Sequence, residues 1–198
     1  MASQTSESGS NLPRLERGTT VRDTYRVQRW LGEGAFGTVY LVRHRFLGPQ
    51  ALKLLSLADG MESDEALREG AILAQLTDPH VVRVFDADLW QVDGREVPFL
   101  TMEYLSGGTL ADLLARRTRL PIDDAIRVAK QLLAGLSAAH RLSPPVLHRD
   151  ITPGNILVVA EQPLTVKLGD FGLAGHIDPV ARLMRAAGTV RYQPPEAA

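Results

Sequence analysis

The chain has 198 residues and a mass of 21.6 kDa, enough for one domain or for one domain and part of another. Its 44% apolar and 23% charged residues are ordinary for a globular protein and exclude whole-chain disorder and collagen-like repeats. A formal net charge of −1 removes the electrostatic case for nucleic-acid binding, and the absence of cysteine excludes disulfides and thiolate chemistry. No apolar run approaches the ~20 residues of a membrane span.

The first half of the chain is predicted to be mostly strands with one helix. Residues 1–22 are rich in Ser, Thr and Glu, lack periodicity, and are expected to form a disordered lead-in. Short apolar runs bounded by turn residues predict strands at 25–31, 38–42, 50–55, 81–85 and 97–104. Helical spacing predicts one helix over 62–76, and Asp93-Gly94 predicts the loop between the last two strands.

The second half is predicted to be mostly helical, after a joint near Gly107-Gly108. Thr109 and Asp112 have the spacing of a helix N-terminal box and predict a short helix that ends at Ala115. Pro121 opens a longer predicted helix to His140, and two short strands follow it at 156–159 and 165–168. One apolar face of the longer helix is predicted from Ile122, Ile126, Ala129, Leu133, Leu136 and His140. The fold class is therefore α+β and two-lobed.

A glycine-rich segment, Gly32-Glu33-Gly34-Ala35-Phe36-Gly37, lies between the first two predicted strands. The pattern GxGxxG alone is a weak signal, since it also marks dinucleotide-binding turns, but those open a helix whereas this one precedes a strand. Without Cβ atoms, the backbone amides of such a hairpin can approach phosphate groups closely. A plain flexible hairpin is the alternative that this motif alone leaves open.

Lysine is scarce in this chain, because only Lys53, Lys130 and Lys167 occur among 22 basic residues. Lys53 lies inside a predicted strand between apolar neighbours, and if it points inward its charge needs an acidic partner or an anion. Glu69 on the predicted helix is the candidate partner. Gly70 beside it either loosens that helix or allows close packing against a neighbouring strand, and both interpretations stay open.

Acidic and amide side chains gather around the last two predicted strands. His148-Arg149-Asp150 precedes Asn155 by a short loop, and Asp170-Phe171-Gly172 follows the next strand. Oxygen ligands at adjacent strand ends, without nearby His or Cys ligands, suit Mg²⁺ between phosphates. Turn-forming Asp residues are the alternative for either motif alone, and explain the two together poorly.

In this order the motifs resemble the eukaryotic-like (Hanks-type) protein serine/threonine kinases. The resemblance covers residues 25–196, and Pro194-Pro195-Glu196 is the last motif. It implies a kinase N-lobe over 23–105 and a partial kinase C-lobe over 106–198, with the rest of that lobe expected beyond Ala198. The arginine-rich composition favours a bacterial source.

The resemblance implies an ATP site, a metal site and a catalytic set. The catalytic residues would be Asp150, Lys53, Asn155, Asp170, Glu69 and Thr189, and Asn155 and Asp170 would hold Mg²⁺, with Mn²⁺ as an alternative. The ATP-binding residues would be Leu31, Gly32, Glu33, Gly34, Ala35, Phe36, Gly37, Val39, Ala51, Lys53, Met102, Glu103, Leu105 and Leu157. Residues 188–196 resemble the peptide-positioning loop of serine/threonine kinases, so the implied partners are ATP and a protein substrate.

One departure from the family concerns the reacting centre. Thr152 stands where these kinases usually carry a lysine that contacts the γ-phosphate, which predicts slower phosphoryl transfer. A non-catalytic, pseudokinase-like binding module is therefore the main alternative. A small-molecule phosphotransferase of the aminoglycoside type is another, which residues 189–196 disfavour. The implied location is cytoplasmic, either alone or as the cytoplasmic part of a longer membrane-anchored protein.

Overall fold

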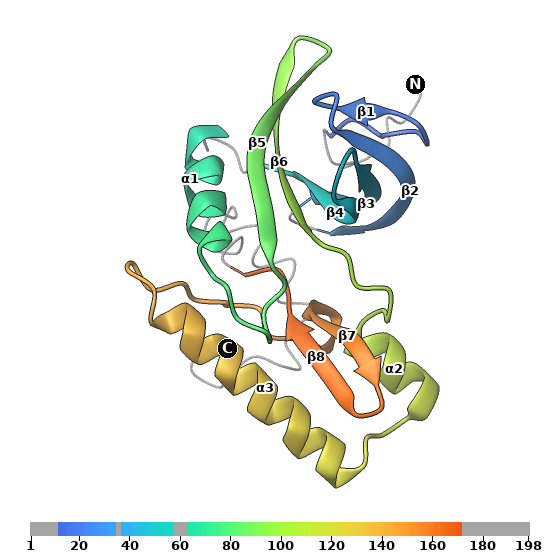
Figure 1. The fold of residues 1–198 in the computed structure, drawn as a ribbon, viewed down its shortest axis with the longest axis vertical. Helices are drawn as coiled ribbons and strands as arrows, with labels where there is room; N and C mark the ends of the chain where they lie inside the picture. Colours follow the sequence, from blue (N-terminus) through green and yellow to red (C-terminus); the bar gives the residue numbers. More distant parts are fainter. Residues whose placement is uncertain (1–11, 35–36, 58–62, 172–198) are drawn as a thin grey trace, which may run out of the picture.

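A computed structural model describes residues 12–34, 37–57 and 63–171, without the side chains of Glu65 and Glu69. The first lobe is a six-stranded sheet in the order β1-β2-β3-β4-β6-β5, whose paired strands are all antiparallel (Figure 1). Its strands are β1 (Thr20–Val21), β2 (Tyr25–Gly34), β3 (Gly37–His44), β4 (Gly48–Leu55), β5 (Val84–Val92) and β6 (Arg95–Glu103). Helix α1 (Ser63–Ala74) packs against β5 and β6.

The second lobe combines helices with a small sheet below the first lobe in Figure 1. It contains α2 (Leu110–Arg117), α3 (Ile122–His140), the 3₁₀ turn η1 (Pro153–Asn155), β7 (Ile156–Glu161) and β8 (Leu164–Leu168). The predicted box at the start of α2 is present: Thr109 Oγ1 accepts a hydrogen bond from the Asp112 amide, and Asp112 Oδ2 accepts one from the Thr109 amide. The two-lobed α+β prediction is confirmed. Within the described ranges, no helix has the length and apolar character needed to cross a membrane.

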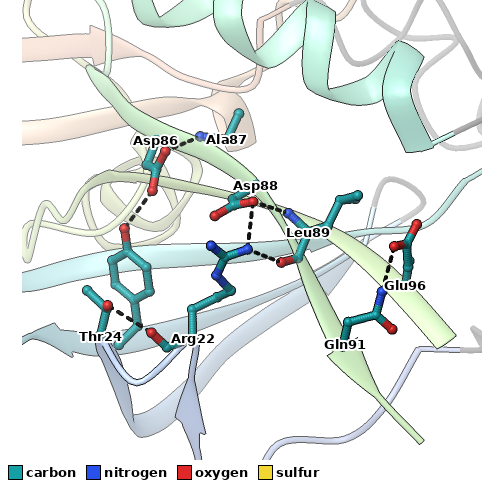
Figure 2. Close-up of polar contacts among 9 residues, drawn as sticks. Arg22, Thr24, Asp86, Ala87, Asp88, Leu89, Gln91 and Glu96 are labelled. Carbon is teal, nitrogen blue, oxygen red and sulfur yellow. Dashed lines mark hydrogen bonds and ion pairs between the residues drawn. The ribbon is translucent and has the colours of Figure 1, made fainter. Parts of the chain in front are cut away.

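The sheet of the first lobe is curled, so that elements far apart in the strand order touch. The Arg22 guanidinium, just after β1, forms an ion pair with Asp88 on β5 at 3.0 Å, and Tyr25 donates a hydrogen bond to Asp86 Oδ2 at 2.9 Å (Figure 2). Burial and the bond to Asp86 raise the pKa of Tyr25 to about 12, so the phenol stays protonated. Because the two ends of the sheet hold each other, the strands that carry the glycine-rich segment have a fixed curvature.

The strand predicted at 81–85 begins later and runs further than expected. Val81 and Val82 pair instead with the second lobe, where the Val82 amide donates to the Leu168 carbonyl at 2.9 Å. Strand β5 then continues through Asp86 and Asp88, whose carboxylates have cross-sheet partners in Arg22 and Tyr25. The two Asp residues hid this strand from the apolar pattern.

Residues 12–22 are more structured than a disordered lead-in. Leu15 is buried in the core of the first lobe, where its amide donates to the Tyr40 hydroxyl, and β1 pairs with β2 through Thr20 and Val21. The domain boundary after residue 22 stays a prediction, but the described structure of the first lobe starts before it.

The apolar face predicted for α3 is not the face that the structure buries. The helix packs against β8 through Val128, Gln131, Gly135 and Ala139, while Ile122, Ile126, Ala129 and Leu133 are exposed. Gly135 and Ala139 allow this contact because they are small: a Cβ added at Gly135 would lie 3.1 Å from the His80 carbonyl oxygen. The helix therefore has apolar side chains on two faces, and among the described residues only one of these faces is covered.

Gly70 in α1 is explained by close packing. It is buried, and an added Cβ would lie 2.6 Å from the Ala87 Cβ and 2.7 Å from Leu100 Cδ2. The helix thus approaches the β5–β6 hairpin more closely than any side chain would allow. This supports the packing interpretation of Gly70.

Replacing Gly70 by Ala is expected to lower the free energy of unfolding by about 1–3 kcal/mol through overpacking, although alanine favours helices intrinsically. Urea unfolding measures the difference. Arg68→Ala, an exposed change in the same helix, should shift it by no more than about 0.5 kcal/mol. A more stable Gly70→Ala protein would contradict the packing explanation.

Candidate active site

A cleft of about 640 Å³ lies between the two lobes. Its walls come from β2, β3 and β4 above, from the segment that joins the lobes, and from η1, β7 and the end of β8 below. The predicted site residues that line it are Leu31, Gly32, Glu33, Gly34, Gly37, Val39, Ala51, Lys53, Met102, Glu103, Leu105, Asn155, Leu157 and Asp170. Residues separated by more than 130 positions in the sequence thus face one cavity.

The glycines of the upper wall differ in what their missing side chains allow. Gly37 has a φ of +131°, and a Cβ there would lie 1.8 Å from the Leu54 carbonyl oxygen, so the backbone path itself requires glycine. At Gly32 and Gly34 an added Cβ would meet no atom within 4 Å. The chain therefore does not need glycine there for internal packing, and the missing side chains leave room in the cleft for a ligand to approach the backbone.

Lys53 is the only buried lysine among the described residues and is 2% exposed. It belongs to β4, an inner strand whose residues from Gln50 to Leu55 are all buried. Its ammonium donates a hydrogen bond to Asp170 Oδ1 at 2.9 Å, so a carboxylate from the second lobe neutralises a charge in the first. The register places Val39 directly opposite Lys53, on the same face toward the cleft.

The predicted pairing of Lys53 with Glu69 stays a prediction. Glu69 lies in α1, but its side chain is outside the described structure. The contact of Lys53 with Asp170 was not foreseen from the sequence. The signal for it was available, since both residues carry opposite charges next to apolar strands and both were predicted to face phosphate groups.

The loop before β7 holds its carboxylate with its own amide. Asn155 Nδ2 donates to the carbonyl oxygen and to Oδ2 of Asp150, both at 2.8 Å. With the amide nitrogen used in this way, the Asn155 side-chain oxygen remains as an acceptor in a residue that lines the cleft. Asp150 itself is half-buried.

His148 joins this loop to the end of β8. Its Nδ1 accepts a hydrogen bond from the Asp150 amide at 3.3 Å, so Nε2 carries the proton and donates to the Gly169 carbonyl at 2.7 Å. The ring packs edge-on against Phe171 with centroids 4.6 Å apart, and both residues are buried. His148 therefore fixes the position of Asp150 relative to Asp170.

The segment that joins the lobes is held by a second ion pair. Lys167 on β8 contacts both carboxylate oxygens of Glu103, at 2.9 Å and 2.7 Å. Leu105 follows in the wall of the cleft, and Ala51 and Leu157 line it from the upper and lower lobes. This gives an apolar slot next to exposed backbone, which suits a flat aromatic ring with hydrogen-bonding edges.

Some residues of the cleft were not foreseen. Ser106, Thr109 and Asp112 also line it. Hydrogen bonds from Thr109 lower the pKa of Asp112, so it is a carboxylate at the cleft edge. The sequence showed Thr109 and Asp112 only as a helix cap, because nothing in the spacing indicates which way a cap faces.

Other predicted residues lie outside what is described. Ala35 and Phe36 of the glycine-rich segment and Thr189 of the final motifs are among them. Their assigned roles stay predictions.

A curled antiparallel sheet with a buried lysine, joined by a short segment to a lobe that carries paired acidic loops, is the architecture of the protein kinases. The chain matches the protein kinase domain family over residues 25–198 and belongs to that family. The resemblance found in the sequence is confirmed, and so is the kinase fold.

The chain is similar to several bacterial serine/threonine kinases. It is 35% identical over 188 residues to serine/threonine-protein kinase A of Synechocystis, and 37% identical over 182 residues to PknA of Corynebacterium glutamicum. These matches cover 87% and 88% of this chain but 35% and 38% of the relatives. The kinase domain structure of Mycobacterium tuberculosis PknI superposes with a TM-score of 0.69 at 32% identity, over 84% of this chain and 66% of that one. The chain thus spans just over a third of the length of these curated relatives.

The buried histidine predicts a pH dependence of stability. Burial lowers the pKa of His148 below its ordinary value, so the unfolded chain takes up the proton first as the pH falls. The contribution to stability is present above about pH 6.5 and is lost as the pH falls toward the folded-state pKa. Urea unfolding between pH 7.5 and 5.5 should show a shallower decline for His148→Gln than for the wild type. The exposed His140→Gln should keep the wild-type slope, and an unchanged slope in His148→Gln would contradict the assignment.

Proposed function

We propose that the chain carries the catalytic machinery of an ATP-dependent protein serine/threonine kinase. The observation that supports this most directly is the convergence of Lys53, Asp170 and Asn155 on one cleft, with Asp150 bonded to Asn155. A binding module needs no carboxylate held beside the phosphate-facing groups. The kinase family and its similarity to serine/threonine kinases supply the reaction class.

The donor set fits Mg²⁺, or Mn²⁺ as an alternative. Asn155 and Asp170 bring side-chain oxygens to the same cleft, and no cluster of three or more His, Cys, Asp or Glu among the described residues forms an all-protein metal cage. Two protein ligands, with the remaining positions left to phosphate oxygens and water, are what Mg²⁺ prefers. When bound, the ion would neutralise the charge that develops on the transferred phosphoryl group.

The chain's own residues then act by position and charge. Lys53, held in the sheet, faces the α- and β-phosphates, and the open backbone at Gly32 and Gly34 covers the phosphates from above. Asp150, oriented by the Asn155 amide, accepts the proton of the attacking hydroxyl or orients that hydroxyl for in-line attack. The slot between Ala51 and Leu157 takes the adenine ring, with the backbone of Glu103 and Leu105 at its polar edge.

The substrate assignment rests on residues 188–196, which lie outside the described structure, and on the relatives. We infer a serine or threonine hydroxyl of a protein as the acceptor. Thr152 supports the alternative of a pseudokinase-like module, because it supplies no charge at the reacting centre.

Transfer of labelled γ-phosphate from Mg-ATP to the chain itself and to a basic protein acceptor tests the proposal. Asp150→Asn should lower the rate about 100-fold or more while leaving ATP affinity nearly unchanged. Asp123→Asn, an exposed carboxylate at the start of α3, is the matched control and should keep full activity. ATP binding without transfer, by this chain and by any longer natural form of it, would favour the pseudokinase. Transfer to sugars or antibiotics in place of protein would favour a small-molecule phosphotransferase.

Thr152 offers a separate prediction about rate. It is half-buried and caps η1 next to Asp150 and Asn155, so a longer basic side chain has a path into the cleft. Thr152→Lys is expected to raise the turnover number about tenfold by adding a positive charge near the transferred phosphate. Thr152→Met, of similar length without charge, should give no gain. Equal turnover in Thr152→Lys and the wild type would show that another group supplies this charge.

A further inference from the structure

The tip of the β3–β4 hairpin, residues 43–49, presents two large apolar side chains to solvent. Phe46 is 79% exposed and Leu47 is 69% exposed, and Phe46 is the most exposed large apolar residue of the described chain. Adjacent exposure of two such residues at one apex is unlike the scattered single residues of an ordinary protein surface. This site lies outside the cleft and has no part in the proposed kinase reaction.

The tip is held in place, so the exposure does not come from a loose loop. His44 Nδ1 accepts hydrogen bonds from the amides of both Phe46 and Leu47, each at 3.0 Å. The His44 ring packs edge-on against Tyr25 with centroids 5.2 Å apart, and the Arg45 amide donates to the Thr24 carbonyl. With their amides bonded back to His44, Phe46 and Leu47 are fixed with their side chains pointing out.

A basic rim surrounds this apolar pair. Arg43 lies directly opposite Arg26 in the β2–β3 register, so the two exposed guanidinium groups share one face of the sheet. Arg45 lies over the Phe46 ring at 5.2 Å. Residues 43–49 contain no acid, and Arg26 and Arg43 form no ion pair with any residue in the described ranges; Asp23 is the acid next to the Thr24 that anchors the tip. Like charges in directly opposed strand positions destabilise a sheet unless an anion lies over them.

We propose that this tip docks on an anionic lipid bilayer, with Phe46 and Leu47 inserted at the interface and Arg26, Arg43 and Arg45 among the headgroup phosphates. Large apolar residues beside a basic rim are the pattern of peripheral membrane binding. A protein partner fits less well, because a stable interface needs about 800 Å² on each side and the surface beside this convex apex is charged.

The geometry keeps the cleft free in the docked state. The glycine-rich segment precedes β3 and the tip follows it, so the strand separates the two by roughly 20 Å. The bilayer would therefore contact the end of the first lobe that lies away from the cleft, and access of ATP and substrate would be unaffected.

Co-sedimentation with sucrose-loaded vesicles tests the proposal on the 198-residue chain. Phosphatidylcholine vesicles with a one-third share of phosphatidylserine should bind the chain, and pure phosphatidylcholine vesicles should bind it far less. Raising the salt concentration should weaken binding to the anionic vesicles, because the attraction of exposed charges is screened. This readout needs no variant, so it holds even if a substitution disturbs folding.

Two double variants then locate the site. Phe46→Ser with Leu47→Ser should weaken partitioning to anionic vesicles at least tenfold through lost apolar burial. Arg43→Gln with Arg45→Gln should weaken it roughly 25-fold, about fivefold for each charge. The matched controls change the second lobe: Ile122→Ser with Leu133→Ser removes exposed apolar surface, and Arg119→Gln with Arg127→Gln removes exposed charge. Both controls should bind as the wild type does.

Thermal unfolding and ATP binding report whether each variant is folded. Wild-type chain that ignores anionic vesicles would overturn the proposal, and so would binding that survives both tip variants or is lost only in the α3 controls. Capture of a defined acidic protein by the tip in the absence of vesicle binding would assign the surface to a protein partner and overturn it as well. None of these outcomes depends on kinase activity.

Discussion

The burial of the Lys53 ammonium is the constraint on which the rest of this structure depends. An inner strand that is buried along its whole central stretch cannot hold a positive charge unless an anion lies beside it. One such anion is Asp170, which belongs to the other lobe. The requirement for charge neutralisation therefore brings the end of β8 against the sheet, and the cleft exists where the two lobes meet at this pair.

The remaining polar contacts keep the two sides of the cleft in register. Val82 bonds to Leu168, Glu103 pairs with Lys167, and His148 bonds to Gly169 next to Asp170. All three contacts involve β8 or the residue that follows it. The short sheet of the second lobe thus receives the joining segment, the catalytic loop and the carboxylate that neutralises Lys53, which explains why so small an element organises the site.

A cleft held in this way is rigid in its walls and open in its centre. Gly37 is fixed by the close approach of Leu54, whereas Gly32 and Gly34 face space that the chain does not fill. The contrast separates a glycine needed for folding from glycines that leave room for a ligand. Pre-formed charge and space of this kind suit phosphoryl transfer, in which the protein contributes mainly position and electrostatic stabilisation.

The sequence by itself determined the family, the two-lobed class and most of the elements, because motif order and short-range patterns are local properties. Thr109 with Asp112 and Asp93 with Gly94 predicted a helix start and a hairpin turn, since caps and turns depend on neighbouring residues. The tertiary structure decided what depends on partners distant in the chain. Strand β5 runs through Asp86 and Asp88 because Tyr25 and Arg22 meet them, and α3 buries its small-residue face because Gly135 fits against His80. The ion pair of Lys53 with Asp170 belongs to this second group, because no local pattern shows which charges meet across 117 positions of sequence.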